Sequence, residues 1–283
     1  MHLDELSVEQ AIDLMQQQDA VAVRAVGSQQ QAIAVAVRLI VGALESGGRL
    51  FYIGAGTSGR LGVLDASECP PTFRTDPEMI QGIIAGGNDA MFKAVEGAED
   101  SRDGGENALR EKHLNAKDVI VGIAAGGTTP FVHGALRYAK SVAAKTIFIS
   151  CVQSFPDETP VDVVIRPLTG PEVLTGSTRL KAGTATKLVL NMLSTLTMVR
   201  LGKVYENLMV DLKASNNKLR DRGAGIIATL TGVDKPTAIG LLQKADGHVK
   251  VAIVMQKKNV DVITAIQILE KHSGRLRAAI GDQ

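Results

Sequence analysis

Two glycine-rich segments, each between an apolar strand and a helix, constrain the fold of this chain more than any other feature. They are Gly54-Ala-Gly-Thr-Ser-Gly-Arg60 and Gly126-Gly-Thr-Thr-Pro130. The start of a helix presents unpaired backbone N–H groups and a partial positive charge, so it attracts phosphate. Glycine lets the backbone approach a ligand closely, and threonine and serine hydroxyls add donors. Two such segments on one sheet predict a pocket for a phosphorylated small molecule.

Apolar strand patterns alternate with helical patterns in the central part of the chain, which predicts a parallel, doubly wound α/β sheet. The strand patterns cover residues 49–53, 79–86, 118–124, 146–150 and 161–165. These runs are continuous rather than alternating, as expected for a sheet covered on both faces. We expect helices at residues 60–67, 108–114 and 131–141, a helix or turn at 90–99, and a break of the first helix at Pro70-Pro71.

Helical patterns also flank the sheet on both sides. Two helices are expected within residues 8–46, and a long helix follows a polar loop at about residues 179–200. Four short amphipathic helices are expected at residues 221–230, 235–245, 249–256 and 260–272. The predicted organisation is therefore N-terminal helices over 1–47, a phosphate-binding catalytic domain over 48–215 and a small all-helical domain over 216–283.

Composition excludes several classes of function. With 31 basic and 30 acidic residues and a net charge of +1, nucleic acid and anionic membranes are poor partners. No apolar run is long enough to span a bilayer, and the acidic first residues do not resemble a signal peptide. Cys69 and Cys151 are too few for a disulfide framework and lack metal-ligand spacing. A cytoplasmic protein with reduced cysteines is expected.

The first glycine segment also fits the dinucleotide pattern through Gly54, Gly56 and Gly59. That pattern requires an acidic residue at the end of the next strand, and residues 83–87 contain none. The hydroxyl pair Thr57-Ser58 favours a lone phosphate instead. The plainer alternatives are that the glycines only turn the chain and that Thr128 and Thr129 only cap a helix.

Two glutamates are candidates for acid–base chemistry. Glu68 precedes the rigid Pro70-Pro71 pair at a helix end, where a negative charge opposes the helix dipole. Glu99 belongs to a second acidic cluster at residues 96–100, and the alternative for each is a solvated surface acid. Lys181 is either an anion partner or an exposed helix lysine. The histidines and cysteines form no nucleophilic triad and no metal-ligand pattern.

Five strings occur together and in order, and they carry a family resemblance. They are Gly54-Ala-Gly-Thr-Ser-Gly-Arg-Leu-Gly62, Asp65-Ala-Ser-Glu-Cys-Pro-Pro71, Val95-Glu-Gly-Ala-Glu-Asp-Ser101, Thr175-Gly-Ser-Thr-Arg-Leu-Lys-Ala-Gly183 and Lys203-Val-Tyr-Glu-Asn-Leu-Met-Val-Asp211. Over about residues 5–280 the chain resembles the N-acetylmuramic acid 6-phosphate etherases, a family within the SIS (sugar isomerase) domain superfamily.

The resemblance implies a SIS-type three-layer α/β fold with a parallel five-stranded sheet and a UBA-like helical C-terminal domain. It also implies a cytoplasmic homodimer that recycles cell-wall sugars. The implied enzyme is a carbon–oxygen lyase that cleaves the D-lactyl ether of N-acetylmuramic acid 6-phosphate and needs no metal or redox cofactor. By resemblance, Glu68 is the acid that protonates departing lactate and Glu99 is the base at C2, although these roles are open to exchange.

The resemblance also implies a set of substrate-binding residues. The 6-phosphate would be held by Gly56, Thr57, Ser58, Gly127, Thr128 and Thr129, and the site would be closed by Ser177, Thr178 and Lys181. The second loop departs from the family, whose members usually carry Ala-Ser-Gly-Arg-Thr-Pro where this chain has Ala125-Gly-Gly-Thr-Thr-Pro130. Two alternatives remain open: a non-catalytic sugar-phosphate sensor similar to the glucokinase regulatory protein, and a sugar-phosphate isomerase.

Overall fold

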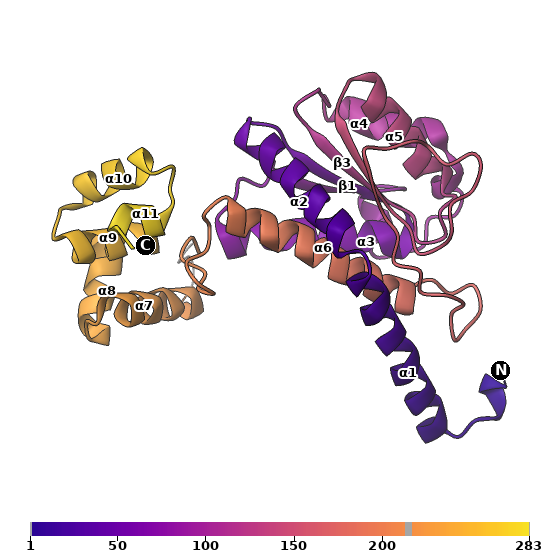
Figure 1. Cartoon of the computed structure of the whole chain (residues 1–283), viewed down its shortest axis with the longest axis horizontal. Coiled ribbons are helices and arrows are strands. Elements are labelled where there is room, and N and C mark those ends of the chain that lie inside the picture. The colour runs from indigo at the N-terminus through magenta and orange to yellow at the C-terminus, as the bar shows by residue number, and fades with distance from the viewer. Residues whose placement is uncertain (1, 213–216, 283) are drawn as a thin grey trace. The chain divides into compact units, whose positions relative to one another are not determined.

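A parallel sheet of five strands lies at the centre of the first of two compact units in the chain. The computed structural model describes residues 2–212 and 217–282. The strands lie in the order β2-β1-β3-β4-β5, and every neighbouring pair is parallel. Their bounds are Leu50–Gly54 for β1, Ile80–Ile84 for β2, Val119–Ile123 for β3, Lys145–Ile149 for β4 and Val163–Ile165 for β5. The predicted five-stranded parallel sheet is confirmed, and Figure 1 shows it between two layers of helices.

Both faces of the sheet are covered, which explains why its strands are continuous apolar runs. On one face, Phe51 and Ile120 share a core with apolar side chains of α5 (Pro130–Ser141). On the other face, α3 (Gly56–Phe73) approaches so closely that a Cβ on Gly62 would lie 2.9 Å from Cβ of Tyr52. Only glycine permits this approach, so the sequence fixes the distance between helix and sheet at this point.

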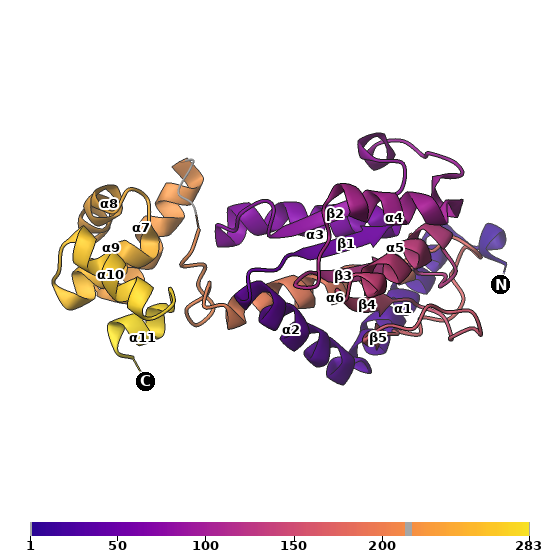
Figure 2. The same ribbon diagram turned by 90° about the horizontal axis from the view of Figure 1, so that it is seen from above.

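The direction of the strand order reverses between β1 and β3. From β1 the chain crosses through α3 to β2, and from β3 it crosses in the opposite direction through α5 to β4. Because these crossovers share one hand, the two helices lie on opposite faces of the sheet, with α5 above and α3 below it in Figure 1, and Figure 2 gives the view from above. Such a reversal leaves a crevice outside the carboxyl ends of the two strands, where ligands bind in doubly wound folds.

The first crossover helix is longer than predicted, and the expected break at Pro70-Pro71 is wrong. α3 begins at Gly56 rather than near residue 60, and it contains both prolines. Each proline removes one helical N–H donor, but its fixed φ is compatible with a helix. Both lie in the last turn of α3, which ends at Phe73, and the N–H of Arg74 still donates to the Pro70 carbonyl at 2.9 Å.

The segment between β2 and β3 also differs in detail from the prediction. The expected helix or turn at residues 90–99 consists of two short 3-10 turns, η2 (Asn88–Met91) and η3 (Ala98–Asp100). The helix expected at residues 108–114 is α4 (Arg102–Glu111), which begins earlier because the Ser101 hydroxyl accepts a hydrogen bond from the N–H of Gly104 at 2.9 Å.

The remaining helices of this unit lie close to their predicted positions. They are α1 (Val8–Gly27), α2 (Gln30–Glu45) and α6 (Lys181–Arg200), with the short turn η1 (Leu3–Glu5) before them. α6 is joined to α3 by the buried Asp65, whose Oδ1 accepts from Nδ2 of Asn191 at 2.8 Å and from Oγ of Ser194 at 3.1 Å. This pair of helices forms part of the layer that supports the first glycine segment.

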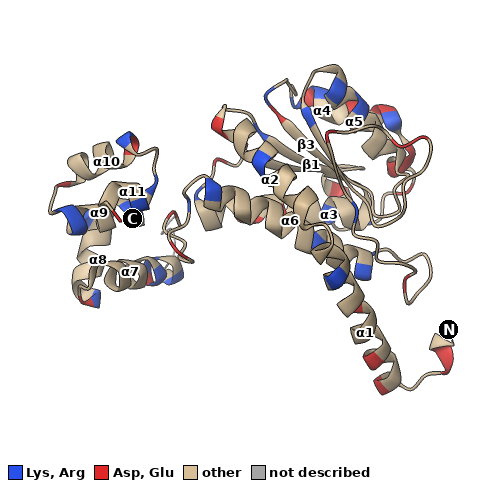
Figure 3. Cartoon of the chain, viewed as in Figure 1, with Lys and Arg blue, Asp and Glu red and all other residues tan. Residues whose placement is uncertain are grey.

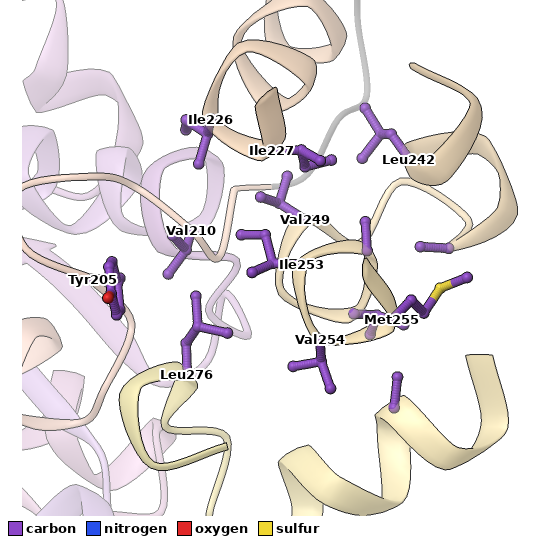
Figure 4. Packing of buried hydrophobic residues seen from close by; sticks show 14 of the residues in the cluster. Tyr205, Val210, Ile226, Ile227, Leu242, Val249, Ile253, Val254, Met255 and Leu276 are labelled. Carbon is purple, nitrogen blue, oxygen red and sulfur yellow. The ribbon is translucent and has the colours of Figure 1, made fainter. Parts of the chain in front are cut away.

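The second compact unit comprises Glu68–Asp76 and the chain from Met198 onward. Its helices are α7 (Asn217–Thr231), α8 (Lys235–Lys244), α9 (Val249–Lys258), α10 (Val262–Lys271) and α11 (Leu276–Ile280), the last of which was not predicted. Figure 4 shows Val210, Ile227 and Leu276 gathered around α9, where Ile253 is completely buried. The unit therefore has its own hydrophobic core.

The predicted domain boundaries of 1–47, 48–215 and 216–283 stay predictions, and the one between residues 215 and 216 lies outside the described residues. None of the helices in the described ranges combines the length and the apolar composition that a membrane span requires.

Candidate functional site

The first β–α loop leaves the sheet at Gly54 and turns directly into α3. Gly56 has a φ of +52°, a conformation that favours glycine, and it is the first residue of the helix. The N–H groups of Gly56, Thr57 and Ser58 have no backbone partner among the described residues. These amides, together with the hydroxyls of Thr57 and Ser58, supply the kind of donors that a helix start offers to an anion.

The second β–α loop leaves the sheet after β3 and begins α5. Its inward-facing carbonyls are occupied: Ala124 accepts from the N–H of Gly127 at 2.8 Å, and Ala125 accepts from the N–H of Cys151 at 2.9 Å. Within the described chain, the N–H groups of Gly126, Thr128 and Thr129 have no backbone partner. Thr129 occupies the N-cap position, but its side chain caps no amide. Its hydroxyl therefore remains available to a ligand.

Both loops leave the sheet at the same level. Gly54 of β1 and Ile123 of β3 are partners in the parallel register, and each is the last residue of its strand. β1 and β3 are also the strands between which the strand order reverses. The two predicted phosphate loops therefore flank the crevice where doubly wound sheets bind ligands.

Glu99 is exposed and lines a small cavity beside the first loop. The cavity has a volume of about 210 Å³, and its walls include Ala55, Gly56, Arg60, Glu96 and Glu99. Arg60 fixes the far wall because its guanidinium donates to the carbonyls of Met91 at 3.1 Å and Lys93 at 3.2 Å. The structure thus brings one predicted catalytic acid together with the predicted phosphate loop.

Glu68 lies further along the same helix that begins at Gly56. Twelve residues separate them, so the rise of an α-helix places Glu68 about 18 Å from Gly56 along the axis. Its side chain is exposed, and it is not among the residues that line the Glu99 cavity. Its catalytic role stays a prediction.

The polar loop before α6 is anchored by two buried charged residues. Glu172 accepts hydrogen bonds from the N–H groups of Lys181 at 3.1 Å and Ala182 at 3.0 Å, so its carboxylate occupies the start of α6. Lys181 is itself buried and donates from Nζ to Oε1 of Gln18 at 2.7 Å. The amine of Lys181 and the start of α6 therefore both have partners within the chain, and the predicted role of Lys181 in closing the site stays a prediction.

This loop nevertheless reaches the first β–α loop. A Cβ built on Gly183 would lie 3.6 Å from both Cγ2 of Thr57 and the carbonyl oxygen of Thr178. Ser177 is half-buried and Thr178 is exposed. The predicted closing residues thus lie on a segment that packs beside Thr57, and their contact with substrate stays a prediction.

Sequence reasoning missed the residues that support these loops. Glu172 precedes the helix that it caps by nine positions, beyond the range of a local capping pattern. His133 carries no local signal of a role at this loop, and it is buried beneath the second loop. Figure 3 shows Lys and Arg interspersed with Asp and Glu over this unit, so no large field of one sign marks the site.

Several relatives of this chain with more than half of their residues identical share one name. The chain is 56% identical over 257 residues to an N-acetylmuramic acid 6-phosphate etherase of Gloeobacter violaceus, covering 91% of this chain and 84% of that protein. It is 54% identical to an N-acetylmuramic acid 6-phosphate etherase of Microcystis aeruginosa, with the same two coverages. The chain belongs to the N-acetylmuramic acid 6-phosphate etherase family. The suspected family resemblance is thereby confirmed.

Two further comparisons agree on the fold of this etherase family member. Residues 32–140 match the family described as glucokinase regulatory protein N-terminal SIS domain. A putative phosphosugar isomerase from Bacteroides fragilis superposes with a TM-score of 0.52 at 20% identity, covering 71% of this chain and 95% of that one. A phosphoheptose isomerase from Francisella tularensis gives 0.51 at 16% identity, covering 69% and 99%. These structures support the SIS-type fold.

Proposed function

We propose that this chain cleaves the D-lactyl ether of N-acetylmuramic acid 6-phosphate, with N-acetylglucosamine 6-phosphate and D-lactate as products. The observation that carries the proposal is the identity above 50% to etherases over about nine-tenths of the chain. The geometry agrees, because two β–α loops with amides that have no backbone partner among the described residues lie at one edge of the sheet, and the first of them borders a cavity that Glu99 lines.

The proposed reaction is an elimination followed by addition of water. In the ring-opened sugar, the C1 aldehyde acidifies the proton on C2, and Glu99 removes that proton as the base. The electron pair forms a C2–C3 double bond as the C3–O bond breaks, and Glu68 supplies the proton that leaves with lactate. Water then adds its oxygen to C3 and a proton returns to C2. Glu99 gives a proton back to C2, and Glu68 regains its proton from the water, so the reaction consumes only one water.

The 6-phosphate anchor is proposed to be the pair of helix starts. Gly56, Thr57 and Ser58 would supply donors from the first loop, and Thr128 and Thr129 from the second. Gly127, whose N–H is bonded to the Ala124 carbonyl, would let the backbone approach the phosphate. A charge-assisted hydrogen bond is roughly twice as strong as a neutral one. Binding energy at the remote phosphate positions C2 and C3 against the carboxylates, which is why the anchor matters for rate as well as affinity.

We further propose that the enzyme is a homodimer. The first two turns of α1 expose Val8, Ile12 and Met15 by 70%, 52% and 42%, at a spacing that places them on one helix face. Figure 1 shows this part of α1 projecting from the rest of its unit. A second copy of the chain would bury the same stripe by two-fold symmetry. Cytoplasmic location and a role in cell-wall sugar recycling belong to this proposal and rest on the family.

The dimer provides a role for Glu68. Because Glu68 lies about 18 Å along α3 from Gly56, we propose that each site combines Glu99 of one protomer with Glu68 of the other. Mixing the inactive variants Glu68→Gln and Glu99→Gln then restores one intact site in each heterodimer. Random pairing of equal amounts gives about a quarter of wild-type activity. No restoration would place both glutamates on the same protomer.

The function is tested by coupling D-lactate release from N-acetylmuramic acid 6-phosphate to a D-lactate dehydrogenase. The wild type is expected to release one lactate per sugar consumed. A sensor would bind the sugar phosphate without turnover, and an isomerase would convert it without lactate. Full turnover by both Glu68→Gln and Glu99→Gln would remove the proposed roles of these residues.

A further inference from the structure

His133 lies on α5 directly beneath the second β–α loop and is almost completely buried. Its Nε2 is 2.6 Å from the carbonyl oxygen of Gly127, and its Nδ1 is 3.1 Å from Oγ1 of the buried Thr159. A carbonyl oxygen can only accept, so Nε2 carries the hydrogen and Nδ1 accepts from the Thr159 hydroxyl. Both ring nitrogens are thus used inside the protein.

Aromatic neighbours hold the imidazole in this orientation. The ring centroid of His133 lies 5.4 Å from that of Phe148 and 5.7 Å from that of Phe155, the latter nearly perpendicular. Phe155 also packs against the loop itself, because a Cβ on Gly127 would lie 3.3 Å from its Cε1. Gly127 has a φ of +83°, which favours glycine. The ring and the loop therefore form one packed unit.

The orientation of the Gly127 carbonyl decides where the next amide points. In a trans peptide the C=O and the following N–H point in opposite directions. Since the Gly127 carbonyl is directed inward to His133, the N–H of Thr128 is directed outward, on the exposed side of the loop. Rotation of this peptide would present a carbonyl oxygen to an anion instead of an N–H.

We propose that His133 is a positioning residue for anion binding, which acts by locking the Gly127–Thr128 peptide with its N–H toward the phosphate. The proposal rests on the proposed function for the identity of the ligand, a sugar 6-phosphate. It assigns His133 no contact with substrate and no proton transfer. Its effect is therefore expected in affinity for phosphate esters and in KM, with a smaller change in kcat.

Three variants of the full-length chain test this role. His133→Leu keeps much of the volume but removes the donor, whereas His133→Gln places an amide N–H near the position of Nε2. Ala139→Gly is the control, because Ala139 is a buried residue of α5 that does not reach the loop. Calorimetry measures binding of N-acetylglucosamine 6-phosphate and of inorganic phosphate, and the D-lactate assay measures KM and kcat.

We expect His133→Leu to bind both ligands on the order of tenfold more weakly, since the charge-assisted hydrogen bond from the Thr128 N–H to the phosphate is lost. His133→Gln should bind more tightly than His133→Leu, and Ala139→Gly should bind like the wild type. Wild-type affinity in His133→Leu would overturn the proposal, as would equal losses in His133→Leu and His133→Gln.

The two hypotheses fail differently. A wild type that binds the sugar phosphate but releases no D-lactate contradicts the etherase function and leaves the test of His133 intact. A wild type that binds neither N-acetylglucosamine 6-phosphate nor inorganic phosphate shows that the loop is not an anion site, and the positioning role then fails.

Discussion

Both β–α loops are glycine-rich turns from a strand into a helix start, but different contacts hold them in place. The first is fixed by backbone crowding, because a Cβ on Gly59 would lie 2.7 Å from the Gly54 carbonyl oxygen and from Cγ1 of Ile84. The second is fixed by a side chain, through the hydrogen bond from His133 to the Gly127 carbonyl. Its Gly126 would accommodate a Cβ with no atom within 4 Å.

This difference has a functional consequence. Close packing holds the first loop together with the hydrogen bond from the Ala85 N–H to the Gly54 carbonyl at 3.0 Å, and Glu99 lines the adjoining cavity. The second loop depends on the orientation of the Gly127–Thr128 peptide. Removing the single His133 donor can therefore change that orientation while the rest of the loop backbone stays in place. We expect changes near the first loop to affect chemistry and stability, and changes near the second loop to affect mainly affinity.

The largest effect is expected from Glu99→Gln in the cavity of the first loop. Loss of a positioned base lowers kcat about 10²- to 10⁴-fold. Glu96→Gln is the matched control, because Glu96 lines the same cavity, and its loss of activity should be smaller. Steady-state release of D-lactate measures both. Equal losses in the two variants would mean that the cavity needs only negative charge and that Glu99 is not the base.

The next largest effect is expected when a crowded glycine of the first loop is replaced by alanine, compared with the same change at an open glycine of the second loop. Gly59→Ala forces a methyl group against backbone, so we expect the free energy of unfolding to fall by about 2–3 kcal/mol. Gly126→Ala meets open space and should change it by less than about 1 kcal/mol. Urea denaturation followed by circular dichroism measures the difference. Similar losses in both variants would contradict the contrast between a crowded and an open loop.

A smaller effect, on the pH dependence of the free energy of unfolding, is expected from Cys151. Its amide donates to the Ala125 carbonyl beneath the second loop. Burial, together with the nearby Glu172 carboxylate, raises the pKa of the Cys151 thiol to about 11 from 9.0. The folded state favours the neutral thiol, so this contribution is complete below pH 9 and is lost as pH rises through 11. The loss reaches about 2 kcal/mol at pH 11.

This pH effect is isolated by comparison with Cys151→Ala. The free energy of unfolding of the wild type should decrease more steeply between pH 9 and pH 11 than that of the variant, since other groups titrate equally in both. Parallel curves for the two proteins would show that the thiol ionises as easily in the folded state as in the unfolded chain.

Local patterns were sufficient to predict most of the fold. The apolar runs at β1, β3 and β4 and the glycines that follow β1 and β3 gave the parallel sheet and both loops, because burial on two faces leaves a continuous pattern in sequence. The predicted break at Pro70-Pro71 failed because the fixed φ of proline is compatible with a helix, and α3 continues through both prolines to Phe73. α11 is only five residues long and gave no periodic signal.

The candidate site was predictable only in part. Hydroxyl residues after a strand indicate a phosphate loop from sequence alone. By contrast, the cavity that joins Glu99 to Gly56 depends on the hydrogen bonds of Arg60 to residues 91 and 93. Such contacts span about thirty positions and follow no local period.

The sequence by itself determined the alternation of strands and helices, the two glycine turns and the family, because each is written in local periodicity or in contiguous strings. Only the tertiary structure decided that both loops flank the reversal between β1 and β3, that Lys181 is bonded to Gln18, and that His133 lies under Gly127. The reason is physical: residues 6 and 163 positions apart meet only when the sheet and its helices pack and exclude water from the groups between them.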